Sequence, residues 1–240
     1  MNAPAVRNLV SITNILLTTD FSPVSLRALP YALDLANRYH SMIHVVHVIR
    51  TEDFTFARPA TLDDFFEDAQ ESSEQRIQAL LQPARERGIP YRTLCGHGNI
   101  CDVLAEYVEE SAIDFITIGS AGRTGLQEWV MGSVAKRIIR EMPCPVLTVR
   151  PGTPAGDRIQ IRRILHATDF SPASMHAVLY ARVLAREYQA HLLLLQVVEK
   201  EPGESLVLTI RFARGLRQLS CRMQGRSGFH QTRSTNYEND

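Results

Sequence analysis

A glycine-rich segment, residues 119–133, has residue types and spacing suited to binding an anion. It reads GSAGRTGLQEWVMGS, with glycines at positions 119, 122 and 132 and a serine at 133. An apolar run precedes the segment and a helical pattern follows it, so these glycines lie between a strand and the start of a helix. Glycine lets the backbone approach a ligand closely, and the N–H groups of a first helical turn attract negative charge. The segment therefore predicts a phosphate site.

The same loop also has structural interpretations. Gly122 can be an ordinary turn glycine, and Gly132 can be the N-cap of the following helix. Arg123 either neutralises a phosphate or is a surface residue of the loop. Trp129 and Met131 are interpreted as core or interface residues. The complete spacing of three glycines and a serine favours phosphate binding.

A second motif, Thr-Asp-Phe-Ser-Pro at residues 19–23, follows a short apolar run. Asp20 can contact a ligand, or it can cap a helix together with Ser22, with Pro23 in the first turn. The presence of the glycine segment in the same domain favours the ligand contact for Asp20.

Residues 14–49 recur as residues 163–198 at a constant offset of 149 residues. The alignment has no gap and 15 of its 36 positions are identical, which indicates a duplication. Asp169 and Ser171 repeat Asp20 and Ser22, but no second glycine segment of the same spacing follows. Helix capping must explain at least part of the repeated motif, and we expect one bound ligand, in the first copy only.

Short apolar runs alternate with helical patterns through the first 150 residues. The expected strands are 15–17, 42–49, 91–95, 113–118 and 146–149, and the expected helices begin near Pro23 and cover 61–87, 100–110 and 133–141. Strands that are apolar throughout are typical of a parallel sheet buried on both faces. The order predicts a five-stranded, parallel, doubly wound α/β sheet of flavodoxin-like type, with right-handed crossovers.

This pattern divides the chain into four parts. They are a complete domain at 12–150, a linker rich in proline and glycine at 151–160, a partial second domain at 161–208, and a divergent, largely disordered tail at 209–240. After residue 201 we expect one helix, Ser205–Leu219, and disorder from 220 to 240. The partial domain lacks three strands, so its sheet would have an exposed edge.

Composition restricts the class of protein. The chain has 240 residues, 45% of them hydrophobic, which is typical of a packed globular protein. Lys plus Arg and Asp plus Glu both number 26, so net charge gives no reason to expect binding to nucleic acid or to a membrane. Neither a leader sequence nor an apolar run of membrane-spanning length is evident. We expect a cytoplasmic protein whose four cysteines are free thiols.

Two further groups of residues have side chains that could serve as ligands. The Cys95-Gly-His-Gly-Asn-Ile-Cys101 segment resembles a metal-ligand cluster or a dinucleotide motif, but it lacks a fourth ligand and its sixth motif position is cysteine rather than glycine. His44 and His47 are expected to share one face of their strand as packed or hydrogen-bonded core residues.

With the Thr-Asp-Phe-Ser motif after the first strand and the Gly-x2-Gly-x9-Gly-Ser motif after the fourth, the sequence resembles the universal stress protein family. The resemblance covers residues 12–150 and, in part, 161–198. It implies a five-stranded α/β sandwich that is usually a homodimer and that binds ATP where the glycine motif is intact.

The resemblance also implies a set of site residues. Carried over by position, the ATP site would comprise Thr19, Asp20, Val48, Gly119, Gly122, Arg123, Gly132, Ser133 and Val134. Asp20 and Val48 would lie at the adenosine end, and the glycines, Ser133 and Val134 would hold ribose and phosphates. Asp20 could meet a ribose hydroxyl, the adenine amine or a magnesium ion. A ligand is expected at the carboxyl ends of the strands in any such sheet.

Three classes of function follow from these features. The first is an ATP-binding stress-response or regulatory module, the second is a slow ATPase or another adenine-nucleotide enzyme, and the third is a dimerising interaction module in which nucleotide is incidental. No Walker motif, catalytic triad or pair of carboxylates beside the glycine loop is recognisable, which favours the first class.

Overall fold

The computed structural model describes residues 10–50, 62–120, 131–154, 156, 158–198, 206–212, 218–223 and 229–231. The chain divides into two compact units, with boundaries after Ser11 and after Ile159. The first unit covers 12–159, and the second contains the duplicated segment.

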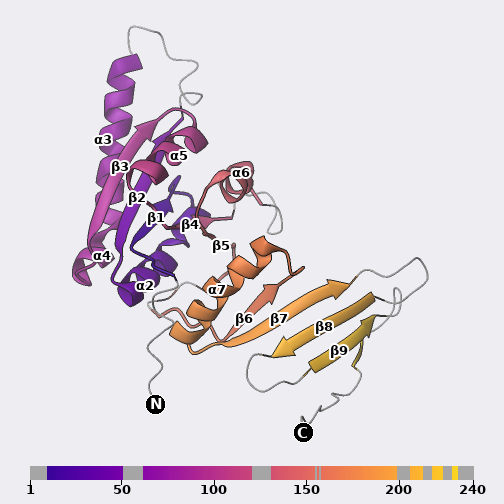
Figure 1. Ribbon diagram of the computed structural model, residues 1–240. Coiled ribbons are helices and arrows are strands. Elements are labelled where there is room, and N and C mark those ends of the chain that lie inside the picture. The colour runs from indigo at the N-terminus through magenta and orange to yellow at the C-terminus, as the bar shows by residue number, and fades with distance from the viewer. Residues whose placement is uncertain are drawn as a thin grey trace. The chain divides into compact units, whose positions relative to one another are not determined.

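The first unit is built on a parallel sheet (Figure 1). Its strands are β1 (Asn14–Thr18), β2 (Met42–Ile49), β3 (Tyr91–His97), β4 (Phe115–Gly119) and β5 (Val146–Val149), in the order β3-β2-β1-β4-β5. All four pairings are parallel, which confirms the predicted sheet. The three central strands, β2, β1 and β4, are buried along most of their length because helices cover both of their faces.

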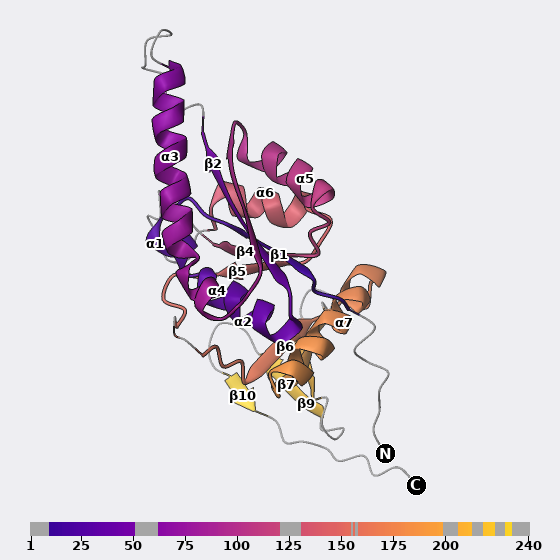
Figure 2. The ribbon, with the colours of Figure 1, turned by 90° about the vertical axis from the view of Figure 1, so that its left-hand side faces the viewer.

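Helices connect the strands and cover both sides of the sheet. They are α1 (Pro23–Leu26), α2 (Leu29–Tyr39), α3 (Leu62–Leu80), α4 (Gln82–Glu86), α5 (Ile100–Glu110) and α6 (Ser133–Glu141). Figure 2 shows α5 and α6 together on one side of the sheet, with α3 on the other. None of the helices in the described part of the chain is both long and apolar enough to cross a bilayer.

Proline sets two helix boundaries that the sequence pattern did not place. The helix predicted at 61–87 is divided at Leu81 into α3 and α4, with Pro83 in the first turn of α4. Pro30 likewise starts α2 after the short α1. Proline lacks an N–H group and its ring collides with the preceding turn, so a helix restarts rather than continues. In the duplicated segment Leu179 stands where Pro30 does, and α7 (Pro172–Glu187) is one continuous helix.

The second unit begins as a copy of the first and then departs from it. Strands β6 (Arg163–Ala167) and β7 (His191–Val198) flank α7 and pair in parallel, as β1 and β2 do. Strands β8 (Leu206–Phe212), β9 (Gln218–Met223) and β10 (Phe229–Gln231) then continue the sheet in antiparallel fashion, in the order β10-β9-β8-β7-β6.

The helix predicted at Ser205–Leu219 is therefore wrong. β8 and the start of β9 occupy this stretch, since β8 pairs with β7 along its length. β-Branched residues at 207, 209 and 210 favour a strand there, a signal that the helical interpretation overlooked. Of the stretch predicted to be disordered, residues 220–223 and 229–231 lie in strands, while 224–228 and 232–240 are outside the described residues.

Equivalent positions of the two copies differ in burial. Leu16 in β1 is fully buried, in a cluster that also contains Leu104 of α5 and Ile138 of α6. Leu165, its counterpart in β6, is 58% exposed. β6 is at one end of the second sheet in the described chain, so its position corresponds to β1 without a neighbouring β4.

Residues beyond β5 pack with the first unit. Arg27 donates from Nη1 to the carbonyl oxygen of Thr153 at 3.1 Å, and the Tyr31 hydroxyl donates to the carbonyl oxygen of Pro154 at 2.9 Å. Ile159 is buried. The proline- and glycine-rich segment is thus attached to the helices that follow β1.

His44 and His47 lie on opposite faces of β2, so the expectation that they share a face is wrong. His44 Nδ1 is 2.9 Å from the Tyr107 hydroxyl of α5, whereas the His47 ring stacks on Phe21 with centroids 4.5 Å apart. Side chains alternate along a strand, and residues three apart must point in opposite directions. Both histidines are nevertheless buried and hydrogen-bonded.

Truncation of Leu16 tests the difference between the two copies. Leu16→Ala should lower the free energy of unfolding by about 2–5 kcal/mol, because it removes buried methyl groups and leaves a cavity. Leu165→Ala, the matched control, should change it by under about 0.5 kcal/mol, since that side chain is largely in water. Urea titrations followed by circular dichroism measure both, and equal losses would contradict the described packing.

His44 should make folding depend on pH. Burial lowers its pKa, Arg92 acts in the same direction, and Asp114 opposes them. The folded protein thus favours the neutral ring, so stability from His44 is complete above its ordinary pKa of about 6.5 and is lost as pH falls through the lowered value. Between pH 7.5 and 5 the free energy of unfolding should fall less in His44→Gln than in the wild type. In the control His176→Gln, at an exposed position, the free energy of unfolding should fall as much as in the wild type.

Candidate functional site

A pocket opens at the carboxyl ends of β1, β2 and β4 in the first unit. It has a volume of about 250 Å³. Its lining combines apolar side chains with two charged ones, and consists of Thr18, Thr19, Asp20, Ser25, Val48, Arg50, Ile100, Ile118, Gly119, Gly132, Ser133, Val134, Ala135 and Ile138. The position agrees with the rule that open parallel sheets bind ligands beyond the carboxyl ends of their strands, beside the central strand where the connections diverge.

Asp20 lies in a tight turn between β1 and α1. Its Oδ1 accepts a hydrogen bond from the Ser22 N–H at 2.9 Å, and Ser22 caps α1 by accepting from the Ser25 N–H at 3.2 Å. The Thr19 hydroxyl accepts from the Phe21 N–H at 2.9 Å and lies 3.0 Å from the Ser25 hydroxyl. Side chains of the motif therefore fix the backbone on which Asp20 faces the pocket.

Phe21 takes a left-handed backbone conformation, with φ at 59°, which is unfavourable for a bulky residue. Its ring contacts the imidazole of His47 and the guanidinium of Arg76, whose Cζ is 4.0 Å from the ring centroid. His47 Nδ1 also donates to the Thr19 carbonyl oxygen at 2.8 Å. These contacts offset the backbone strain next to Asp20.

The same turn occurs in the second unit. Asp169 accepts from the Ser171 N–H at 2.9 Å, and Ser171 caps α7 by accepting from the Ser174 N–H at 3.2 Å. Hydrogen bonding to Ser171 holds the pKa of Asp169 well below its usual range. The motif is thus a helix cap in both units, and in the first unit the helix that it caps also lies against Gly119.

Gly119 ends β4 in close contact with the start of α1. A Cβ atom at this position would lie 2.8 Å from Ser25 Cα and 2.8 Å from the Val24 carbonyl oxygen. Both are backbone atoms, so a side chain here would force the chain apart. The glycine is required by the approach of β4 to the turn that carries Asp20.

The start of α6 faces the pocket. Gly132 is the N-cap in extended conformation, and no side chain caps this end. The Gly132 N–H donates to the Ser120 carbonyl oxygen at 2.9 Å, which ties the helix start to the end of β4. No acidic residue lies in the first turn. The amides and the dipole of this helix end are therefore available to an anion.

The structure brings together seven of the nine residues predicted for the site. Thr19, Asp20, Val48, Gly119, Gly132, Ser133 and Val134 all line the pocket. Gly122 and Arg123 lie outside the described residues, as does Trp129, whereas Met131 packs against the core on the α6 side.

Seven lining residues were not predicted from the sequence, namely Thr18, Ser25, Arg50, Ile100, Ile118, Ala135 and Ile138. Arg50 follows β2 two residues after Val48, and Ile100 is the first residue of α5. The alternation along β2 was a usable signal for Arg50, because residues 48 and 50 share a direction on an extended chain. Nothing in the local sequence marks Ile100.

Cys95 and Cys101 belong to different elements, β3 and α5. Burial raises the pKa of both thiols, and that of Cys144 to about 11, which lowers their reactivity at neutral pH. Among the described residues no three or more His, Cys, Asp or Glu side chains gather in a group that could hold a metal ion.

The sequence model of the universal stress protein family matches residues 11–150 and 160–221. The chain belongs to the universal stress protein family. The first matched segment covers the five parallel strands of the first unit, and the second covers the duplicated segment together with β8 and most of β9.

Individual relatives agree with this membership. Universal stress protein MJ0531 of Methanocaldococcus jannaschii is 28% identical over 137 residues, which are 57% of this chain and 81% of the relative. Universal stress protein YxiE of Bacillus subtilis is 25% identical over 143 residues, covering 56% of this chain and 97% of the relative. A crystal structure of a universal stress protein from Archaeoglobus fulgidus has a TM-score of 0.62 at 23% identity, covering 78% of this chain and 68% of that one. This last likeness shows the shared fold.

The contact between Gly119 and α1 is open to a direct test. Gly119→Ala should destabilise the first unit by about 1–3 kcal/mol, because the added methyl group meets backbone atoms that cannot rotate away. Gly156→Ala is the matched control, since a Cβ there meets nothing within 4 Å. Thermal unfolding measures both, and a Gly119→Ala protein as stable as the control would contradict the close approach.

Proposed function

We propose that the first unit binds one molecule of ATP in the pocket at the carboxyl ends of β1, β2 and β4. The observation that carries the proposal is the start of α6, where Gly132 leaves the helix end open beside the pocket. The sequence of the glycine segment and membership of the universal stress protein family support the same ligand.

The pocket residues suit the parts of a nucleotide. The N–H groups at the start of α6, from Ser133 onward, would hold phosphate oxygens. Gly119 lets the backbone approach that group without a side chain in the way. Apolar side chains of Val48 and Ile118 would face the base, and Asp20 would accept a hydrogen bond from a hydroxyl or amine of the nucleoside.

Magnesium would arrive with the ATP phosphates. Asp20 is the one carboxylate among the described lining residues, and its Oδ1 already accepts from the Ser22 N–H. Mg²⁺ usually takes one or two carboxylates together with phosphate oxygens and water. A single protein carboxylate beside the phosphates fits that pattern, and we assign the protein no separate metal site.

The proposed role is regulatory binding within a stress response rather than rapid catalysis. Phosphoryl transfer to water needs a group that orients the attacking water and a held metal ion. Of the described pocket residues, Asp20 alone has a carboxylate, and it is engaged in its own turn. Nucleotide occupancy would therefore act through the stability and surface of the domain.

We further propose that the protein acts in the cytoplasm and forms a homodimer.

Substitution of Gly132 tests the proposal through charge. Wild-type protein should bind one MgATP per chain in calorimetric titration, and Gly132→Asp should weaken this at least about tenfold because a carboxylate at the helix start repels phosphate. Aspartate is a favourable N-cap, so the helix should still form.

Gly132→Asn is the matched control, since asparagine has nearly the same shape and caps helices equally well. A loss of affinity as large as that of the aspartate variant would indicate steric blocking, and absence of ATP binding by the wild type would refute the function. Release of ADP during the titration would identify a slow ATPase instead.

A further inference from the structure

Two helices from different parts of the chain begin at the pocket. Ile100, the first residue of α5, and Ser133, the first residue of α6, both line it. Ala135 and Ile138 extend the wall along α6. The relative placement of these two helix starts therefore sets the shape of the pocket on this face of the sheet.

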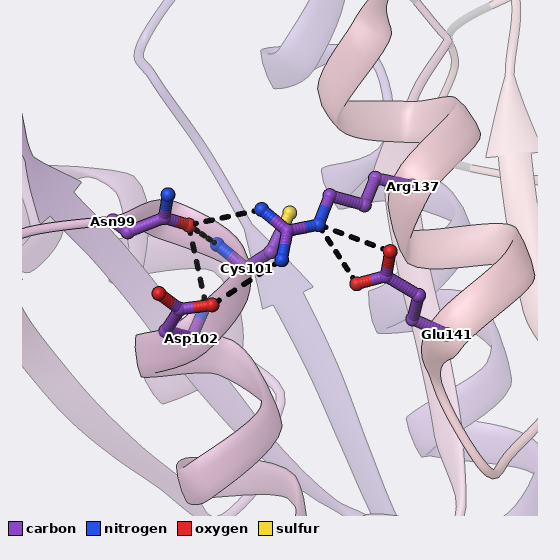
Figure 3. A network of polar contacts seen from close by, with 5 residues as sticks. All are labelled: Asn99, Cys101, Asp102, Arg137 and Glu141. Carbon is purple, nitrogen blue, oxygen red and sulfur yellow. Dashed lines mark hydrogen bonds and ion pairs between the residues drawn. The ribbon is translucent and has the colours of Figure 1, made fainter.

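The side chain of Arg137, one turn into α6, joins the two helix starts (Figure 3). Its Nη1 lies 3.5 Å from Asn99 Oδ1, and its Nη2 lies 3.4 Å from Asp102 Oδ1. Asn99 is the N-cap of α5, and its Oδ1 also accepts from the Cys101 N–H at 3.0 Å. One guanidinium thus contacts both the cap and the first turn of the neighbouring helix.

Glu141 fixes the direction in which this guanidinium points. Arg137 Nε is 2.8 Å from one carboxylate oxygen of Glu141 and 3.0 Å from the other, as the dashed lines in Figure 3 show. The Nε edge is therefore held by α6 itself, and the two Nη atoms are left for α5. A planar guanidinium can serve both groups at once, whereas the single nitrogen of a lysine cannot.

These contacts add little to the stability of the fold. The side chains of Arg137 and Asp102 are 43% and 70% exposed, and water screens ion pairs of this kind. Buried side chains, including Leu104 of α5 and Ile138 of α6, hold the two helices on the sheet. The consequence of the Arg137 contacts is geometric, because they act at the helix ends that form the pocket.

We propose that Arg137 is a positioning residue that sets the start of α6 against the start of α5 for a phosphate-bearing ligand. The inference rests on the proposed nucleotide function. Arg137 acts through the N–H groups at Ser133, and a ligand held there in turn steadies the first turn of α5, since coupling between two sites is reciprocal.

Affinity for two ligands tests this role. Arg137→Gln should weaken ATP binding by about two- to fivefold, the scale of an exposed ion pair, and should leave binding of adenosine unchanged because adenosine has no phosphate. Asp102→Asn should show a smaller loss in the same direction. In the double variant the two losses of ATP affinity should not multiply, because both substitutions remove the same interaction between Arg137 and Asp102. Calorimetric titration measures all four proteins.

Arg140→Gln is the matched control, since it removes the same charge from an exposed position of the same helix. Its ATP affinity should equal that of the wild type. ATP should also slow amide hydrogen exchange at Cys101 and Asp102 in the wild type, and less so in Arg137→Gln.

Each contrary result has a distinct meaning. The positioning role would be overturned if Arg137→Gln lost as much affinity for adenosine as for ATP. It would also be overturned if the losses of ATP affinity multiplied in the double variant, or if Arg140→Gln lost ATP affinity. ATP binding by the wild type with an unaffected Arg137→Gln variant would overturn that role alone. A wild type that binds no ATP would overturn the proposed function together with it.

Discussion

The structure of the first unit depends on the burial of β1 between two parallel neighbours. β1 pairs with β2 on one side and β4 on the other, and its residues Ile15, Leu16 and Leu17 are at most 1% exposed. A strand buried in this way needs helices on both faces of the sheet. The chain therefore leaves β1 along one face and reaches β4 from the other, and the pocket opens where these paths separate.

The second unit shows how a related copy of the segment is arranged without a strand in the place of β4 among its described residues. Its copy of β1 has no counterpart of β4 beside it in the described chain, and Leu165 is exposed where Leu16 is buried. On the far side of β7 an antiparallel strand, β8, takes the place that β3 has next to β2. Local pattern suffices to form the strand, helix and strand of each copy, but the neighbours of those elements decide what they bury.

The Asp-Phe-Ser turn separates structural from functional roles. Asp20 and Asp169 make the same hydrogen bond at the same distance, so this bond belongs to helix capping. What distinguishes Asp20 is its surroundings, namely Gly119 against α1 and the open start of α6 across the pocket. A ligand role for Asp20 is consequently a property of the assembled site rather than of the motif.

The sequence by itself determined most elements of the first unit, the cap at Ser22 and half of the residues that line the pocket, because periodicity, prolines and glycines act on residues close along the chain. Tertiary structure decided that the strand at 206–212 pairs with β7, although β-branched residues already favour a strand there, and it alone decided the contribution of Ile100 to the pocket. It also decided that Arg137 meets Asn99 and Asp102 across two helices. Contacts between residues tens of positions apart depend on how whole elements pack, and local pattern has no record of that packing.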